Sequence, residues 1–137
     1  LLPIANLNDI AVVADVRAAV ANKLFVTDLI ETASALVTLT ETSGAVAVDW
    51  DTFINGEVTV DQATVISNPT NGQPGTWRTI IVKGNAATDR TITFGSNFLG
   101  EVQTITTADS TRWFLLMIYC VTTSHFVVSS NRAVGAA

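Results

Sequence analysis

Residues 113–121 read Trp-Phe-Leu-Leu-Met-Ile-Tyr-Cys-Val, an unbroken apolar run of nine residues. Aromatic and β-branched side chains favour a strand, and nine residues are far fewer than the roughly 20 that a membrane-spanning helix needs, so we expect no membrane insertion. Successive side chains on a strand point to opposite faces, and here both faces are apolar. A single sandwich core buries one face of a strand. The run therefore predicts that an N-terminal helix or a neighbouring subunit covers the other face.

Short segments that alternate apolar and polar residues flank this run across residues 36–137. Turn sequences separate them, notably Asn55-Gly56 and the loop 68–75, and the glycines fit turn positions with positive φ. No repeat of solenoid length is detectable. The pattern predicts a mainly β fold, an antiparallel, jelly-roll-like β-sandwich. Its expected strands lie at 36–42, 45–51, 57–60, 63–66, 77–83, 90–94, 102–106, 113–121 and 125–129.

Residues 1–35 follow a different pattern. Apolar side chains recur there at helical spacing, and Asn8-Asp9 offers an N-cap, which predicts a helix over about residues 9–22. We expect two parts, an N-terminal helical or extended attachment segment (1–35) and a β-sandwich module (36–137). Because the chain begins with Leu rather than Met, we expect it to be a piece of a longer product. The apolar positions expected to contact other chains are Ile10, Val13, Val16, Val20 and Leu24.

Composition narrows the classes of partner. Hydrophobic residues make up 48% of the chain and charged residues only 14%, which argues against disorder and suggests that much of the surface meets other protein. The net charge of −5 argues against nucleic-acid binding, which needs a basic surface. Residues 1–61 carry nine acidic and two basic side chains, and the rest carries three acidic and five basic. The acidic side chains of the first range either attract the basic side chains of the second range in a neighbouring subunit, or both sets face solvent.

Two residue pairs have the chemistry of catalysis but lack its supporting groups. Asp49 and Asp51 share one face of a strand, as paired glycosidase carboxylates would, yet no His or Arg cluster lies near them in the sequence. Cys120 and His125, the only residues of their types, lack an orienting third group, and a thiol in an apolar strand is usually inert. We therefore expect no enzymatic activity, no cofactor, no metal site and no internal disulfide.

Two tryptophans are candidates for binding carbohydrate. Trp50 and Trp77 lie at expected strand ends beside turn loops, where an exposed ring can stack on a sugar. The alternative is that they pack in the sandwich core, where aromatic side chains contribute much of the buried area.

Two segments of the module carry a family resemblance. Residues 63–72 (Ala-Thr-Val-Ile-Ser-Asn-Pro-Thr-Asn-Gly) and 90–98 (Arg-Thr-Ile-Thr-Phe-Gly-Ser-Asn-Phe) lie on either side of the strand 77–82. This arrangement resembles a β-module of virion proteins of tailed bacteriophages, over residues 36–130. The chain departs from the module at Thr111-Arg112-Trp113. The resemblance implies a head-fibre, spike, decoration or tail-fibre component of a phage or of a phage-like particle such as a gene transfer agent. It brings no catalytic residues.

The predicted function is a structural protein on the surface of a virion, attached to other virion proteins through residues 1–35. The alternatives are a carbohydrate-binding module for host-surface polysaccharide and a depolymerase using Asp49 and Asp51. We expect a symmetric homo-oligomer, with a trimer favoured over a pentamer because similar phage spikes project along three-fold axes. In addition to the N-terminal positions, the expected interface contains Trp113, Leu115, Met117 and Tyr119.

Overall fold

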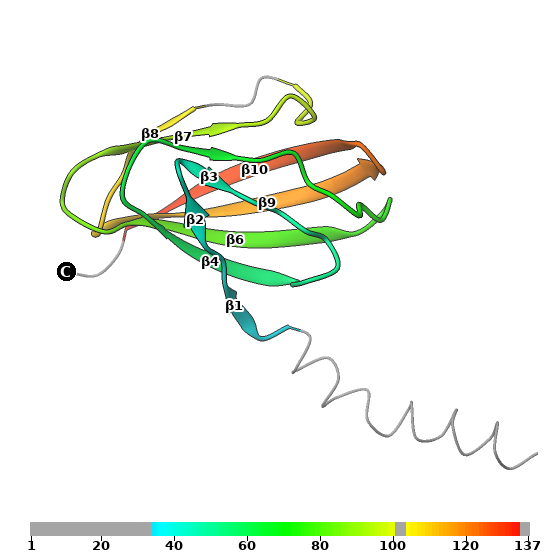
Figure 1. Cartoon of the computed structure of the whole chain (residues 1–137), viewed down its shortest axis with the longest axis horizontal. Coiled ribbons are helices and arrows are strands. Elements are labelled where there is room, and N and C mark those ends of the chain that lie inside the picture. Colours follow the sequence, from blue (N-terminus) through cyan, green and yellow to red (C-terminus); the bar gives the residue numbers. More distant parts are fainter. Residues whose placement is uncertain (1–33, 101–103, 135–137) are drawn as a thin grey trace, which may run out of the picture. The chain divides into compact units, whose positions relative to one another are not determined.

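The computed structural model describes residues 34–100 and 104–134, and this part of the chain is mainly β with no helix (Figure 1). It contains two five-stranded sheets. Sheet A has the order β1 (Leu36–Thr38), β4 (Asn55–Val60), β6 (Trp77–Gly84), β9 (Arg112–Thr122) and β10 (His125–Val134). Sheet B has the order β2 (Glu41–Thr42), β3 (Ala45–Val46), β5 (Thr64–Ile66), β7 (Arg90–Phe94) and β8 (Ile105–Ala108).

The mainly β prediction is confirmed, but the expectation that all strands pair antiparallel is wrong. Strands β1, β4 and β6 are parallel neighbours in sheet A, and β3, β5 and β7 are parallel neighbours in sheet B. The chain passes from one sheet to the other and back, so each return places a strand beside its predecessor in the same direction. Strands β8, β9 and β10 then pair antiparallel with β7, β6 and β9. The sequence did not reveal the parallel pairs, because side chains alternate with a period of two in parallel and antiparallel strands alike. The segments that form the parallel strands also share no repeated sequence.

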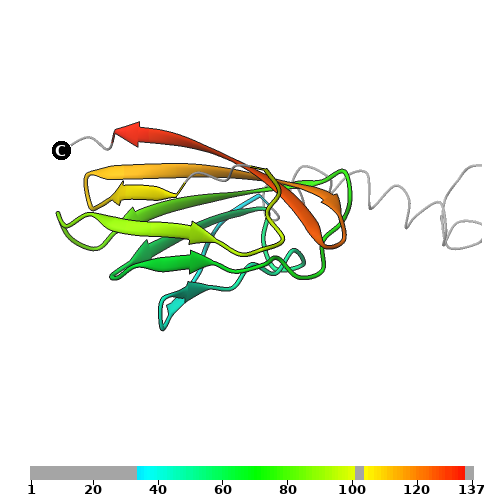
Figure 2. The ribbon, with the colours of Figure 1, turned by 90° about the horizontal axis from the view of Figure 1, so that it is seen from above.

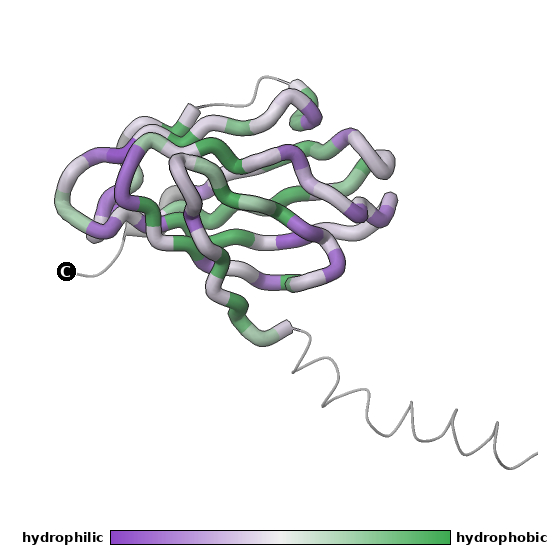
Figure 3. The backbone as a smooth tube through the Cα atoms, viewed as in Figure 1, coloured by the Kyte–Doolittle hydropathy of each residue, from purple (hydrophilic) through white to green (hydrophobic). Residues whose placement is uncertain are grey.

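Both sheets contribute side chains to one core, and the two layers are visible in Figure 2. Apolar residues follow the strands in Figure 3, whereas hydrophilic residues gather in the connecting loops. The expected strand 36–42 divides in two. The Leu39 amide still donates to the carbonyl of Glu57 (2.7 Å), and the chain then crosses to sheet B. Core side chains with no exposed surface include Val46, Ile66 and Ile92 from sheet B and Val58, Ile80, Leu116, Ile118 and Phe126 from sheet A.

Two glycines of the phage-like segments are needed for close packing, so their interpretation as positive-φ turn residues is wrong. Positive φ is found at Gly44, Gly75 and Gly100. A Cβ at Gly95 would lie 2.8 Å from the backbone nitrogen of Asn68, and one at Gly72 would lie 2.8 Å from the Phe126 ring.

The turn between β8 and β9 is organised by Asp109, which is 3% exposed. One carboxylate oxygen accepts hydrogen bonds from the backbone amides of Thr111 and Arg112, each at 2.7 Å. The other accepts from Arg112 Nε at 2.7 Å, and the Arg112 guanidinium also contacts Asp89. The segment in which the sequence departs from the phage module is thus tied into a closed turn.

The Asp109 turn predicts a pH dependence of stability. The Arg112 guanidinium, with the amide donors of the turn, holds the pKa of Asp109 well below its usual range. The unfolded chain therefore binds this proton more readily, with a pKa of about 3.9, and the stabilisation by the carboxylate is lost as the pH falls below about 5. We expect Asp109→Asn to lower the melting temperature at pH 7 and to flatten its decline between pH 6 and pH 3. Parallel melting profiles for the two proteins would contradict this role.

Residues 1–33 lie outside the described residues, so the structure does not test the helix expected over 9–22. The same holds for the interface positions predicted there, which are Ile10, Val13, Val16, Val20 and Leu24.

Candidate functional site

Strand β9 has two apolar faces, as the sequence indicates. Phe114, Leu116, Ile118 and Cys120 point into the core, with exposed fractions of 8% for Phe114 and 0% for the others. The alternate residues form part of the outer face of sheet A, which we define by the outward side chains of β4, β6, β9 and β10. The four predicted interface residues of this strand all lie there, with Trp113 and Tyr119 exposed and Leu115 and Met117 half-buried.

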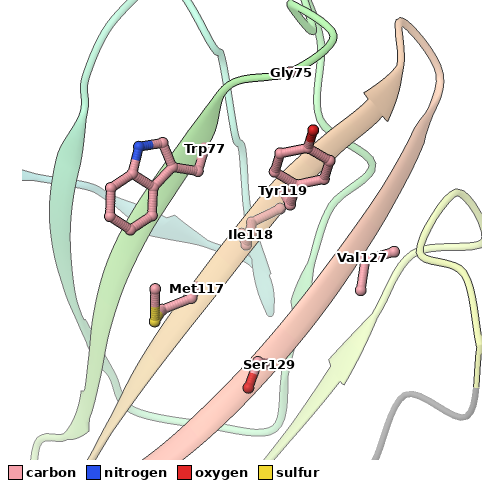
Figure 4. A pocket seen from close by; sticks show the side chains of 7 residues that line it. All are labelled: Gly75, Trp77, Met117, Ile118, Tyr119, Val127 and Ser129. Carbon is pink, nitrogen blue, oxygen red and sulfur yellow. The ribbon is translucent and has the colours of Figure 1, made fainter.

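An open groove of about 560 Å³ crosses this outer face. Trp77 on β6 lies directly across from Tyr119 on β9, and Val127 on β10 lies across from Tyr119 on its other side. Figure 4 shows the rings of Trp77 and Tyr119 projecting from neighbouring strands, with Met117 nearby. We call this the aromatic groove. It is lined by Gly75, Trp77, Met117, Ile118, Tyr119, Val127 and Ser129.

Pairing between the strands creates the groove. The carbonyl of Thr76, just before β6, accepts a hydrogen bond from the amide of Cys120 (2.9 Å), and the amide of Gly75 donates to the Cys120 carbonyl (2.9 Å). These bonds fix the register that places Trp77 beside Tyr119. Gly75 adopts a φ of 85°, which lets the chain turn into β6 at this point. Sequence reasoning placed Trp77 near a strand end but missed its partners, because cross-strand register is not readable from one strand alone.

The two tryptophans of the outer face differ in their surroundings. Trp113 is 38% exposed, its indole N–H donates to the carbonyl of Ser110 (3.1 Å), and Lys83 Nζ lies 5.3 Å from its ring centroid. Trp77 is 56% exposed, and its indole N–H has no hydrogen-bond partner among the described residues. Its exposed ring is therefore the more available of the two for contact with another molecule.

Few of the side chains that the structure describes on this face are charged. Glu57 and Lys83 form an ion pair at 2.9 Å on the outward side of β4 and β6, and no charged side chain lines the aromatic groove. Charges resist removal from water, so the uncharged surface around the groove loses its water at lower cost than a charged one would.

The prediction that Trp50 binds carbohydrate is wrong, because the structure places this residue in the core with no exposed surface. Its indole N–H donates to Thr76 Oγ1 (2.8 Å), and its ring packs 5.2 Å from that of Phe126. The Arg78 guanidinium lies 4.9 Å from the Trp50 ring centroid and donates to its carbonyl (2.6 Å from Nη2). Trp50 and Trp77 therefore do not form one site.

The two candidate catalytic pairs, Asp49 with Asp51 and Cys120 with His125, make contacts that do not correspond to catalysis. Asp49 Oδ1 accepts from the Asp51 amide (3.1 Å) and from Asn71 Nδ2 (2.9 Å), which closes a loop and lowers the pKa of Asp49. The Cys120 thiol is buried, donates to the Thr122 carbonyl (3.1 Å), and has a pKa that burial raises.

His125, the other member of the Cys120–His125 pair, lies at the surface. Its Nδ1 bonds Thr122 Oγ1 (2.9 Å) rather than the Cys120 thiol, so the two side chains do not form a nucleophile–base pair.

Within residues 34–100 and 104–134, no group of three or more His, Cys, Asp or Glu side chains is placed to hold a metal ion. In the same part of the chain, no helix is long and apolar enough to cross a membrane. Neither a family model, nor a curated protein, nor a solved structure matches the sequence or the fold.

Proposed function

We propose that this chain is a structural subunit of a multi-subunit particle, of the virion type that the sequence resembles, and that it acts through protein contacts rather than catalysis. The observation that carries the proposal is the apolar outer face of sheet A with its aromatic groove. Aromatic residues and Met are enriched at the centres of protein interfaces, and charged residues are depleted there. The lining of the groove has this composition.

In this proposal residues 1–35 attach the chain to other virion proteins, and the β-module stands at the particle surface. Neighbouring copies form a symmetric homo-oligomer, a trimer before a pentamer. Three modules around a three-fold axis would turn three outer faces toward that axis and remove their apolar surface from water. Burial of this kind contributes roughly 25 cal/mol per Å².

Carbohydrate binding is the second candidate, and the exposed Trp77–Tyr119 pair is the observation that favours it. Stacking on a sugar needs such rings, but hydroxyl groups also lose water and require hydrogen-bonding partners. Among the described residues that line the groove, Tyr119 and Ser129 are the ones that offer a side-chain hydroxyl. We therefore rank a protein partner above a glycan. Binding on an array of host-surface polysaccharides that is abolished by Trp77→Ala would reverse this order.

Deletion of residues 1–25 tests the attachment role. We expect the truncated chain to remain folded, with the far-ultraviolet circular dichroism of a β protein, and to fail to enter particles that incorporate the full chain. The physical reason is that the described residues of the two sheets already supply a continuous apolar core. Normal incorporation of the truncated chain would count decisively against this role.

A further inference from the structure

Building on the proposed function, we infer that the aromatic groove is occupied by the same face of a neighbouring copy, with Trp77 and Tyr119 as the anchors of the contact. The partner is thus a second copy of this chain, and the interface centres on β6, β9 and β10 at the Trp77 end of the sheet. The sequence alone predicted an interface at N-terminal positions and on β9, and assigned Trp77 to carbohydrate binding.

The exposed apolar area suits such a contact. Trp77, Trp113 and Tyr119 are 56%, 38% and 48% exposed. With aromatic side chains of 150–250 Å², these three leave roughly 300 Å² of open surface. Val121 and Val127, at 42% and 44% exposed, extend it. The total falls in the range of about 300–600 Å² that is typical of the largest apolar patch on a monomer, a patch that is often functional. Two such faces supply most of the roughly 1,000 Å² that a specific interface needs, and the half-buried Leu115 and Met117 of the same face add to them.

The distribution of charge favours contact between two copies at this face rather than at other parts of the module. Residues 34–137 contain eight acidic and five basic side chains, and Asp51 and Asp61 are exposed in loops away from the outer face. The module thus has a formal net charge of −3, which disfavours contacts that bring its acidic loops together. The outer face carries the mutually paired Glu57 and Lys83, so two copies meet there without opposing like charges.

Trp77 and Tyr119 are the anchors because their rings are exposed and their polar groups make no hydrogen bond among the described residues. Among the described residues, neither the Trp77 indole N–H nor the Tyr119 hydroxyl has a hydrogen-bond partner. Trp113, in contrast, is already held by Ser110 and Lys83 of its own chain. Trp and Tyr dominate the energetics of interfaces, since each combines a large apolar ring with one polar group that can bond to the partner.

Cross-linking of the full chain locates the contact. Ser129→Cys places a thiol in the groove, and Val65→Cys places one at an exposed position on sheet B, with unmodified chain as the background for the buried Cys120. With a short bismaleimide, which links one thiol on each of two chains, we expect covalent dimers from Ser129→Cys and background levels from Val65→Cys. Equal yields from the two variants, or background from Ser129→Cys while the protein is oligomeric, would overturn the inference and leave the proposed function standing.

A second pair of variants tests the energetics. Val127 and Val65 are 44% and 40% exposed, one on each sheet, so Val127→Asp and Val65→Asp are matched. A charge placed at the interface should weaken association roughly tenfold or more, measured by light scattering over a dilution series, and Val65→Asp should leave it unchanged. Circular dichroism shows whether each variant is folded. Unchanged association of folded Val127→Asp would refute the inference, whereas a monomeric unmodified chain would refute the proposed homo-oligomer as well.

Discussion

Trp50→Ala is expected to destabilise the module by about 3–5 kcal/mol, the usual cost of removing a large aromatic side chain from a core. The indole has no exposed surface, bonds Thr76, and packs against Phe126 and Arg78. Because small domains have only about 5–15 kcal/mol of stability, this loss should remove a large part of it and lower the urea midpoint of unfolding strongly. Urea unfolding followed by circular dichroism at constant protein concentration measures the change.

The control for this substitution is Leu99→Ala, which also truncates a large apolar side chain but at a position that is 41% exposed. It should change the free energy of unfolding by no more than about 0.5 kcal/mol. If Trp50→Ala were as stable as the control, Trp50 would not be a core residue. The sequence-based prediction that it lies at a surface carbohydrate site would then be favoured again.

Gly95→Ala is expected to cost about 2–3 kcal/mol, at the upper end of the penalty for overpacking. The new methyl group would overlap the Asn68 side chain and lie 2.8 Å from its backbone nitrogen, just beyond the paired ends of β5 and β7. Asn68 cannot simply move away, since its side-chain oxygen accepts the amide of Asn97 (2.8 Å). Thermal or urea unfolding of the variant gives the loss.

Gly100→Asn is the control for Gly95→Ala, because it adds a side chain at a position of positive φ without steric crowding. Gly100 has a φ of 85° and open space around the position of a Cβ, and Asn tolerates this backbone conformation better than other residues. We expect a loss well below that of Gly95→Ala. A Gly95→Ala protein as stable as unmodified chain would show that the two phage-like segments do not pack against each other as described.

The sequence predicted the local features of the fold well, because those depend on neighbouring residues. The two apolar faces of 113–121 follow from alternation, and the strand there is found at Arg112–Thr122. Parallel pairing of β4 with β6 was missed because alternation carries no information about strand direction. The role of Gly95 was missed because it depends on contact with Asn68, which is 27 positions away in the chain.

The candidate site was predicted in part. Alternation identified Trp113, Leu115, Met117 and Tyr119 as one face, and the structure places them together on the outer face of sheet A. Trp50 and Trp77 looked alike in the sequence, since both lie beside turns. What separates them is tertiary: Trp50 points between the sheets, and Trp77 points outward across from Tyr119.

The mass of the full chain in solution is the most direct test of the central claim, that copies assemble through the outer face of sheet A. Multi-angle light scattering at micromolar concentration should give a discrete multiple of the 14.5 kDa chain, with three times that mass as the expected value. A monodisperse species of 14.5 kDa with an intact β fold would contradict the account, because the apolar outer face would then need no partner.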